Sequence, residues 1–191
     1  MSEPVGTPGR GELEARAAAV RLVVFDVDGV LTDGGLYYGP RGEALKRFDV
    51  RDGQAIVLAR QAGLSCAALS ARTSEIVESR ARELGMDAVR QGSRDKAETL
   101  EELLAQLSIR RDACAYMGDD LNDLRAMARV GLSACPSDAA LEVRARALFV
   151  ARQQGGRGAA RELIELCLKA SGRWQTVVND LFHPPGQTTP G

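Results

Sequence analysis

Two aspartates that follow an apolar run are the residues of this sequence best suited to chemistry. Leu22 to Phe25 is apolar, and Asp26 and Asp28 come next, directly before Gly29. A buried strand that stopped here would place both carboxylates at its carboxyl end, and the glycine would let the chain turn away. Two close carboxylates repel and need a shared proton or a cation, and Mg²⁺ prefers oxygen ligands. The pattern indicates metal-assisted phosphoryl transfer, with an ordinary Asp-rich turn as the alternative.

Three further polar sites follow in a consistent order. Ser70 ends a second apolar run, where a hydroxyl beside backbone N–H groups could hold a phosphate oxygen. Lys96 begins a helical pattern, where it could neutralise a bound phosphate. Taken alone, Ser70 is better explained as a turn or cap residue and Lys96 as one exposed charge among many. Asp119, Asp120 and Asp123 follow a third apolar run, and so many carboxylates at a strand end are unfavourable without a cation.

Together the four pieces resemble the motifs of the haloacid dehalogenase-like phosphatase superfamily. The resemblance implies that Asp26 is the nucleophile, which forms an aspartyl-phosphate. Asp28 would protonate the leaving alkoxide and then activate water. Ser70 and Lys96 would hold the phosphoryl oxygens.

The implied Mg²⁺ site uses the same carboxylates. Asp26, the backbone carbonyl of Asp28 and Asp119 would hold the ion, whereas Asp123 would orient Lys96 or a metal-bound water. Dehalogenase members of the superfamily lack the second aspartate because they protonate no alkoxide. Asp28 therefore favours a phosphatase or mutase over a dehalogenase.

Length and composition limit the class of protein. A chain of 191 residues predicts one domain with at most a small insert, and its net charge of −1 argues against a nucleic-acid or anionic-membrane partner. The amino terminus shows no apolar targeting segment, and no stretch approaches the roughly 20 apolar residues that span a membrane. The cysteines form no C-x-x-C pair, so we interpret them as reduced core residues of a cytoplasmic protein. They are Cys66, Cys114, Cys135 and Cys167.

Short apolar runs alternate with helical patterns along the chain. The predicted strands are 21–25, 65–69, 87–90, 113–117, 130–134 and 147–150. The predicted helices are 53–62, 74–84, 95–107, 121–128, 138–144 and 157–170. This alternation predicts an α/β fold, a Rossmann-like doubly wound parallel sheet, with ligands at the carboxyl ends of the strands. We expect a disordered leader over 1–17, with a possible short helix at 11–20, a main domain over 18–175 and a flexible tail over 176–191, which holds His183.

A β-hairpin interrupts the alternation at about 35–48, around the turn 39–42. It is too small to form a cap domain. Either substrates are large, or neighbouring subunits complete the pocket. Exposed apolar residues would favour an oligomer, and the alternative is a hairpin that packs on its own domain. These residues are Leu36, Tyr38, Leu45 and Phe48.

One branch of the superfamily is similar over roughly residues 18 to 175, namely the 3-deoxy-D-manno-octulosonate (KDO) 8-phosphate phosphatases. The similarity lies in segments 26–34, 48–53, 118–120 and 155–158. It implies a capless homotetramer that hydrolyses KDO 8-phosphate in lipopolysaccharide biosynthesis. It also implies a set of substrate contacts, with the last residue reaching a neighbour's site. These are Asp28, Asp49, Val50, Arg51, Asp52, Gly53, Arg72, Arg80, Lys96, Asn122 and Arg157.

Two departures leave the substrate open. Ser70-Ala71-Arg72 stands where the branch usually has Thr-Gly-Arg, and Val57 stands where it often has a basic residue. A nine-carbon sugar acid 9-phosphate is therefore an alternative substrate. A second alternative is a non-catalytic oligomerisation module of the same fold, although the intact aspartates and Lys96 favour an enzyme.

Overall fold

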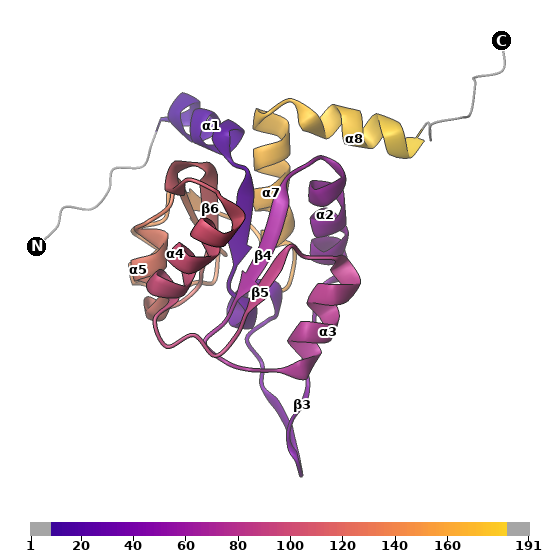
Figure 1. The fold of residues 1–191 in the computed structure, drawn as a ribbon, viewed down its shortest axis with the longest axis vertical. Helices are drawn as coiled ribbons and strands as arrows, with labels where there is room; N and C mark the ends of the chain where they lie inside the picture. Colours follow the sequence, from indigo (N-terminus) through magenta and orange to yellow (C-terminus); the bar gives the residue numbers. More distant parts are fainter. Residues whose placement is uncertain (1–8, 183–191) are drawn as a thin grey trace, which may run out of the picture.

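The chain folds around a six-stranded parallel sheet, shown in Figure 1 as a computed structural model that describes residues 9–182. The strands lie in the order β5-β4-β1-β6-β7-β8, and each neighbouring pair is parallel. Their bounds are β1 Leu22–Phe25, β4 Ser65–Leu69, β5 Ala88–Arg90, β6 Cys114–Met117, β7 Leu132–Cys135 and β8 Phe149–Val150. The predicted Rossmann-like α/β fold is confirmed, and the six strands fall where the sequence placed them, to within two residues at each end.

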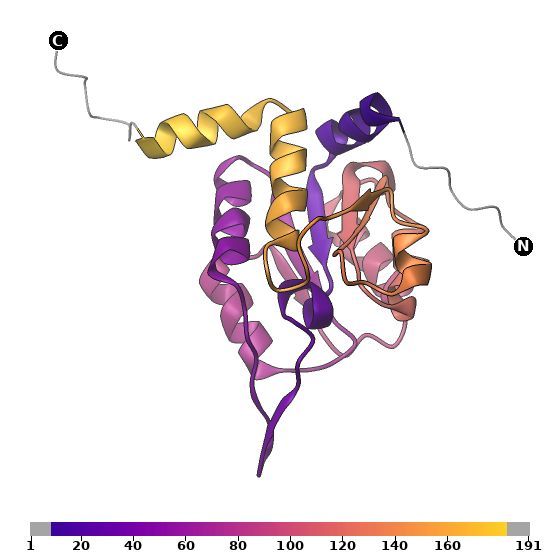
Figure 2. The same cartoon turned by 180° about the vertical axis from the view of Figure 1, so that it is seen from behind.

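Helices cover both faces of this sheet (Figures 1 and 2). One face packs against α1, α2, α3 and α7, and the other against α4, α5 and α6. The helix bounds are α1 Arg10–Ala19, α2 Val50–Gln61, α3 Glu75–Leu84, α4 Lys96–Leu107, α5 Leu124–Met127, α6 Leu141–Arg144, α7 Ala159–Ala170 and α8 Arg173–Phe182. No helix within residues 9–182 is long and apolar enough to cross a membrane.

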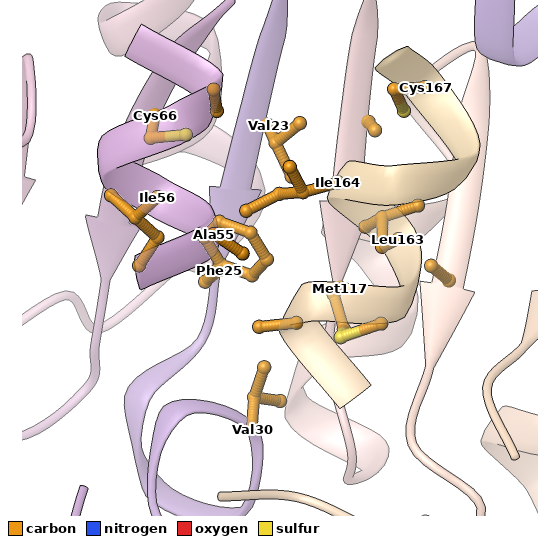
Figure 3. Close-up of a cluster of buried hydrophobic side chains, with 14 of the residues drawn as sticks. Val23, Phe25, Val30, Ala55, Ile56, Cys66, Met117, Leu163, Ile164 and Cys167 are labelled. Carbon is orange, nitrogen blue, oxygen red and sulfur yellow. The ribbon is translucent and has the colours of Figure 1, made fainter. Parts of the chain in front are cut away.

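Strand β1 shows why its sequence is continuously apolar. Val23 and Phe25 face the cluster beneath α7, whereas Leu22 and Val24 point into the cluster on the opposite face. Figure 3 shows Val23 and Phe25 beside Ile164 of α7. All four strand residues are fully buried, as expected where helices cover both faces of a parallel sheet. This packing fixes the point at which the chain leaves the sheet.

The strand order creates a topological switch point beside β1. From β1 the chain builds outward through β4 and β5, and then returns to build β6, β7 and β8 on the other side. Phe25 pairs with Met117, so β1 and β6 end side by side. Ligands of open α/β sheets bind at such a reversal, outside the carboxyl ends of the strands. The residues that follow Phe25 and Met117 therefore share one crevice.

The hairpin consists of β2 Tyr37–Gly39 and β3 Gly42–Leu45, which form a separate antiparallel pair that projects from the main body (Figure 1). Tyr38 and Leu45 are each 65% exposed, so its apolar residues do lack cover within this chain. Phe48 is the exception, because it is half-buried and packs against the main core.

The ends of the chain differ from the expectation. Helix α1 matches the short helix that the sequence allowed at 11–20, and it packs on α7 with Ala17 fully buried, so residues 10–17 of the expected disordered leader are part of the fold. Residues 176–182 belong to α8 rather than to a tail, because Trp174 and Val177 give this helix an apolar side that packs inward. Residues 1–8 and 183–191, including His183, lie outside the described part. The four cysteines are free and buried, as predicted.

Candidate active site

Asp26 sits at the carboxyl end of β1, where its backbone N–H donates to the carbonyl of Met117 at 2.9 Å. The next residues form a tight turn, in which Gly29 has φ +87°. A Cβ at Gly29 would lie 2.0 Å from Asp119 Oδ2, so only glycine allows the two loops to approach this closely. The aspartates after β1 and β6 are therefore brought together, as the sequence predicted.

Lys96 forms the cationic centre of the site. It begins α4, where the Asp95 side chain caps the helix by accepting from the N–H of Ala97. Its ammonium lies 2.8 Å from Asp26 Oδ2 and 2.7 Å from Asp123 Oδ1, and its side chain is 3% exposed. A buried lysine is stable here because it is paired with two carboxylates.

Asp123 anchors that lysine. Its Oδ1 also accepts from the Tyr116 hydroxyl at 2.7 Å, and its Oδ2 accepts from the backbone N–H groups of Asp119 and Asp120 at 3.1 and 3.3 Å. Four donors thus surround a fully buried carboxylate. This arrangement agrees with the expectation that Asp123 orients Lys96, and it leaves Asp26 and Asp119 with carboxylate oxygens available to a ligand.

The electrostatics of the three carboxylates favour a cation. One oxygen each from Asp26, Asp119 and Asp123 lies within 4.8 Å of the others. Burial, followed by repulsion from Asp123, raises the pKa of Asp26 to about 6 despite the nearby Lys96. Burial, followed by repulsion from Asp26 and Asp123, raises the pKa of Asp119 to about 8. A divalent cation with oxygen ligands would relieve this repulsion, so the residues fit Mg²⁺.

The pocket around these groups gathers most of the predicted phosphate-binding residues. Ser70 follows β4, is buried, and accepts from the N–H of Arg72 at 3.1 Å. The lining also includes two exposed residues of the segment that follows β6, Asp120 and Asn122. The full set is Asp26, Asp28, Ser70, Ala71, Arg72, Lys96, Asp119, Asp120 and Asn122.

The segment from Asp49 to Gly53 lies at the start of α2 and outside this pocket. The Asp49 side chain caps α2 and holds Arg51, whose guanidinium also reaches the carbonyl of Arg157. The hydrogen bond from Arg51, with burial opposing it, lowers the pKa of Asp49. Val50 is 79% exposed.

Asp52 has a structural position that the sequence analysis did not foresee. Its two carboxylate oxygens accept from the N–H groups of Gly158 and Arg161, at 3.0 and 2.9 Å, at the start of α7. A buried carboxylate capping a helix amino terminus explains why Asp52 is 2% exposed. Asp52 therefore joins α2 to α7, because each of its carboxylate oxygens accepts from a backbone N–H at the start of α7.

Arg80 is likewise outside the pocket that holds Asp26. Its guanidinium packs over the ring of Phe48, pairs with Glu83 at 2.9 Å, and lies where a Cβ on Gly53 would collide with it. Arg72 and Arg80 therefore line different pockets, although both were expected at one site.

The glycine-rich loop before α7 braces the turn after Asp26. A Cβ on Gly155 would lie 1.8 Å from the carbonyl oxygen of Gly29, and the Gly156 N–H donates to Val30 at 2.8 Å. This loop therefore supports the turn within its own chain. The side chain of Arg157 is exposed.

Sequence analysis missed three residues of the site. They are Lys46, Glu43 and Tyr116. Lys46, on the hairpin, contacts Asp28 and lies 3.0 Å from Glu43. The Tyr116 hydroxyl donates to Asp123. No spacing rule marks them, because the contacts of Lys46 and Tyr116 with the aspartates depend on how the chain folds back. One signal was available: lysine occurs only at positions 46, 96 and 169 of this arginine-rich chain.

These features define a class of protein. Residues 68–163 match the family described as haloacid dehalogenase-like hydrolases, and the chain belongs to this family. The close relatives define the branch. The chain is 42% identical to the 3-deoxy-D-manno-octulosonate 8-phosphate phosphatase KdsC of Yersinia pestis, over 87% of this chain and 89% of that protein. It is also 42% identical to KdsC of Escherichia coli strain K12, over 87% and 88%. The resemblance to this branch is therefore confirmed.

Solved structures agree with this assignment. A probable YrbI family phosphatase from Pseudomonas syringae superposes with a TM-score of 0.87 at 43% identity, covering 91% of this chain and 98% of that chain. The KDO 8-phosphate phosphatase of Moraxella catarrhalis, solved with magnesium, phosphate and KDO, has a TM-score of 0.87 at 35% identity, covering 91% and 99%.

Proposed function

We propose that this protein is a Mg²⁺-dependent phosphatase that hydrolyses KDO 8-phosphate to KDO and phosphate in lipopolysaccharide biosynthesis. The observation that carries the proposal is the cluster of buried Asp26, Lys96 and Asp123 with half-buried Asp119, beside Asp28. Support for the substrate comes from the KdsC relatives, which match over most of both chains. A non-catalytic module would have no need of this cluster, so its retention supports the enzyme.

The chemistry follows from the positions of the two aspartates. A carboxylate oxygen of Asp26 attacks phosphorus and forms an aspartyl-phosphate, while Asp28 gives a proton to the departing sugar oxygen. Asp28 then takes a proton from the water that cleaves the aspartyl-phosphate, which restores Asp26 and releases phosphate. Lys96 and Ser70 hold phosphoryl oxygens, because phosphoryl transfer depends chiefly on positioning and charge neutralisation.

The metal ligands in this proposal are Asp26, Asp119 and the backbone carbonyl of Asp28. The raised pKa values of Asp26 and Asp119, caused by burial and mutual repulsion, support a bound cation at these carboxylates. When bound, Mg²⁺ would neutralise charge on the phosphoryl group and keep Asp26 ionised. The KDO 8-phosphate phosphatase of Moraxella catarrhalis was solved in complex with magnesium, which supports the same ion here.

We also propose that the active form is a homotetramer in the cytoplasm, in which a neighbouring subunit completes the site. Exposed apolar side chains on the hairpin, including Tyr38 and Leu45, support an interface there. Arg157 is exposed beside the turn after Asp26 and is available to a neighbour. Four free buried thiols suit a reducing compartment.

Phosphate release from a panel of sugar phosphates, with Mg²⁺ and with EDTA, tests the proposal. We expect Mg²⁺-dependent release from KDO 8-phosphate that is lost in Asp26→Asn and kept in Asp112→Asn, a matched change at an exposed aspartate that precedes β6, at the opposite end of that strand from the pocket. Preference for a nine-carbon sugar acid 9-phosphate would change the substrate assignment, and Ala71 and Val57 would be the first residues to examine for the cause. No release from any phosphomonoester by the folded wild type would refute the enzyme.

A further inference from the structure

The hairpin delivers a buried cation to Asp28. Lys46 follows β3 directly, and its ammonium contacts Asp28 Oδ1 although the two residues are 18 positions apart. The Lys46 side chain is 1% exposed, whereas Tyr38 and Leu45 on the same hairpin are among the most exposed apolar residues. A lysine buried this completely on an otherwise exposed element indicates a specific role for its ammonium.

Glu43 fixes the position of that ammonium. Its Oε1 lies 3.0 Å from Lys46 Nζ and 3.5 Å from Arg72 Nη2, and its Oε2 accepts from the Ser74 hydroxyl at 2.5 Å. Ser74 is the residue before α3, so these contacts tie the hairpin to the main domain. Asp28 is thereby connected to α3 through the side chains of Lys46 and Glu43.

The second oxygen of Asp28 is less firmly held. Arg72 Nε lies 3.7 Å from Asp28 Oδ2, beyond hydrogen-bond distance, and the Asp28 side chain is 20% exposed. Within the described residues, Lys46 is therefore the closest ionic partner of Asp28, and Asp28 itself lines the pocket. A compact ammonium suits this role better than a guanidinium, which requires a broader planar site.

We propose that Lys46 is a positioning residue that holds Asp28 by Oδ1, so that Oδ2 carries the proton of the acid form and passes it to the leaving oxygen, with Glu43 fixing Lys46. This inference rests on the proposed phosphatase function. It assigns phosphoryl binding to residues of the main domain and control of the leaving-group proton to the hairpin. Lys46 acts through Asp28 and touches no reacting atom.

Dependence on the leaving group distinguishes this role from a general structural one. An alkoxide from a sugar phosphate needs a proton as it departs, whereas nitrophenolate is stable without one. Lys46→Met keeps the length of the side chain and removes its charge. We expect kcat to fall about 10- to 100-fold on the best sugar phosphate, and less than about threefold on p-nitrophenyl phosphate.

Two further variants complete the experiment. Lys169→Met makes the same change at an exposed lysine and should leave both rates unchanged. Glu43→Gln keeps the shape at position 43 and should give a smaller loss, about three- to tenfold, with the same dependence on leaving group. Lys46→Met added to Asp28→Asn should cost no further activity on the sugar phosphate, because both changes disable one proton transfer.

The results separate this inference from the proposed function. Equal losses on both substrates in folded Lys46→Met and Glu43→Gln, or no loss on either substrate, would overturn the positioning role while the wild type remained a phosphatase. If Lys46→Met fails to fold, Glu43→Gln carries the same comparison. A wild type inactive on every phosphomonoester would refute the function itself, and the role of Lys46 with it.

Discussion

The two lysines buried at this site are held in different ways. Lys96 stands on the first turn of a helix that packs on the sheet, and both of its carboxylate partners follow β1 and β6. Lys46 stands on a two-stranded hairpin, and its partners are Glu43 of that hairpin and Asp28. The first lysine is fixed by the core, and the second by an element that has no core of its own.

This difference divides the site into two halves. Around Asp26, every anchoring residue comes from a buried strand end or helix start, so the phosphoryl-binding half is preorganised. Around Asp28, the orientation depends on a hairpin whose outer residues, such as Leu45, are exposed in the single chain. We therefore expect changes in the first half to affect folding and chemistry together, and changes in the second half to depend on assembly.

The largest effect is expected from Lys96→Met. Asp26 and Asp123 would lose their shared counter-charge while remaining buried, which costs about 3–5 kcal/mol of unfolding free energy when one partner of a buried pair is removed. Denaturant unfolding would measure it. Lys169→Met, at a lysine 54% exposed, is the control and should stay within about 0.5 kcal/mol of the wild type. Equal stabilities would show that Lys96 does not stabilise the half of the site around Asp26.

A metal titration tests whether Mg²⁺ binds in the same half of the site. Mg²⁺ at 100 times its dissociation constant should stabilise the wild type by about 2.7 kcal/mol, since it binds the folded carboxylates. At pH 9, where Asp119 is ionised because its pKa is about 8, Asp119→Asn removes one of three close negative charges, so it should raise the melting temperature in EDTA by about 2–4 °C and abolish the rise with Mg²⁺. A variant that keeps the full Mg²⁺ response would place the ion elsewhere.

On the hairpin, Leu45→Glu tests dependence on assembly. A charge at this exposed position should weaken an apolar subunit contact by about 2 kcal/mol and shift the protein towards smaller species. Light scattering at several concentrations would detect the shift. Leu141→Glu, at a residue of α6 that is 71% exposed, is the matched control. An unchanged mass for Leu45→Glu would argue that the hairpin packs on its own domain alone.

The smallest effect is expected at the junction of the two halves. Arg72 contacts Tyr38 of the hairpin at 3.1 Å and lines the pocket, whereas Arg80 packs on Phe48 in a separate hollow. Arg72→Lys should raise KM about tenfold, near 1.4 kcal/mol, because the forked guanidinium is lost. Arg80→Lys should keep KM within about twofold of the wild-type value. A larger rise in KM would show that Arg80 contributes to substrate binding.

Much of the fold and the reacting centre could be predicted from the sequence. The apolar run from Leu22 to Phe25 must be buried on both faces, and the carboxylates that follow it must then lie at the sheet edge. The same reasoning placed Asp119 beside them, because parallel strands end together. Local patterns were sufficient here, since each site residue adjoins the strand or helix that carries it.

The roles of Asp52, Arg80 and Lys46 could not be predicted in the same way. Asp52 caps a helix whose first residues are more than 100 positions away, and Arg80 turns towards Phe48 instead of the pocket. Each outcome depends on which elements pack together, and no periodicity records that choice. Sequence resemblance grouped Asp52 and Arg80 with the substrate contacts, whereas the structure shows Asp52 bound to α7 and Arg80 in another hollow.

The sequence by itself determined the sheet, its reactive edge and the carboxylates and lysine that meet there, because burial of short apolar runs leaves one arrangement for the residues that follow them. The tertiary structure decided how these groups are oriented. Four donors fix Asp123, and a hairpin brings Lys46 to Asp28. Orientation depends on contacts between residues distant in sequence, and only the folded chain brings those residues within hydrogen-bond distance.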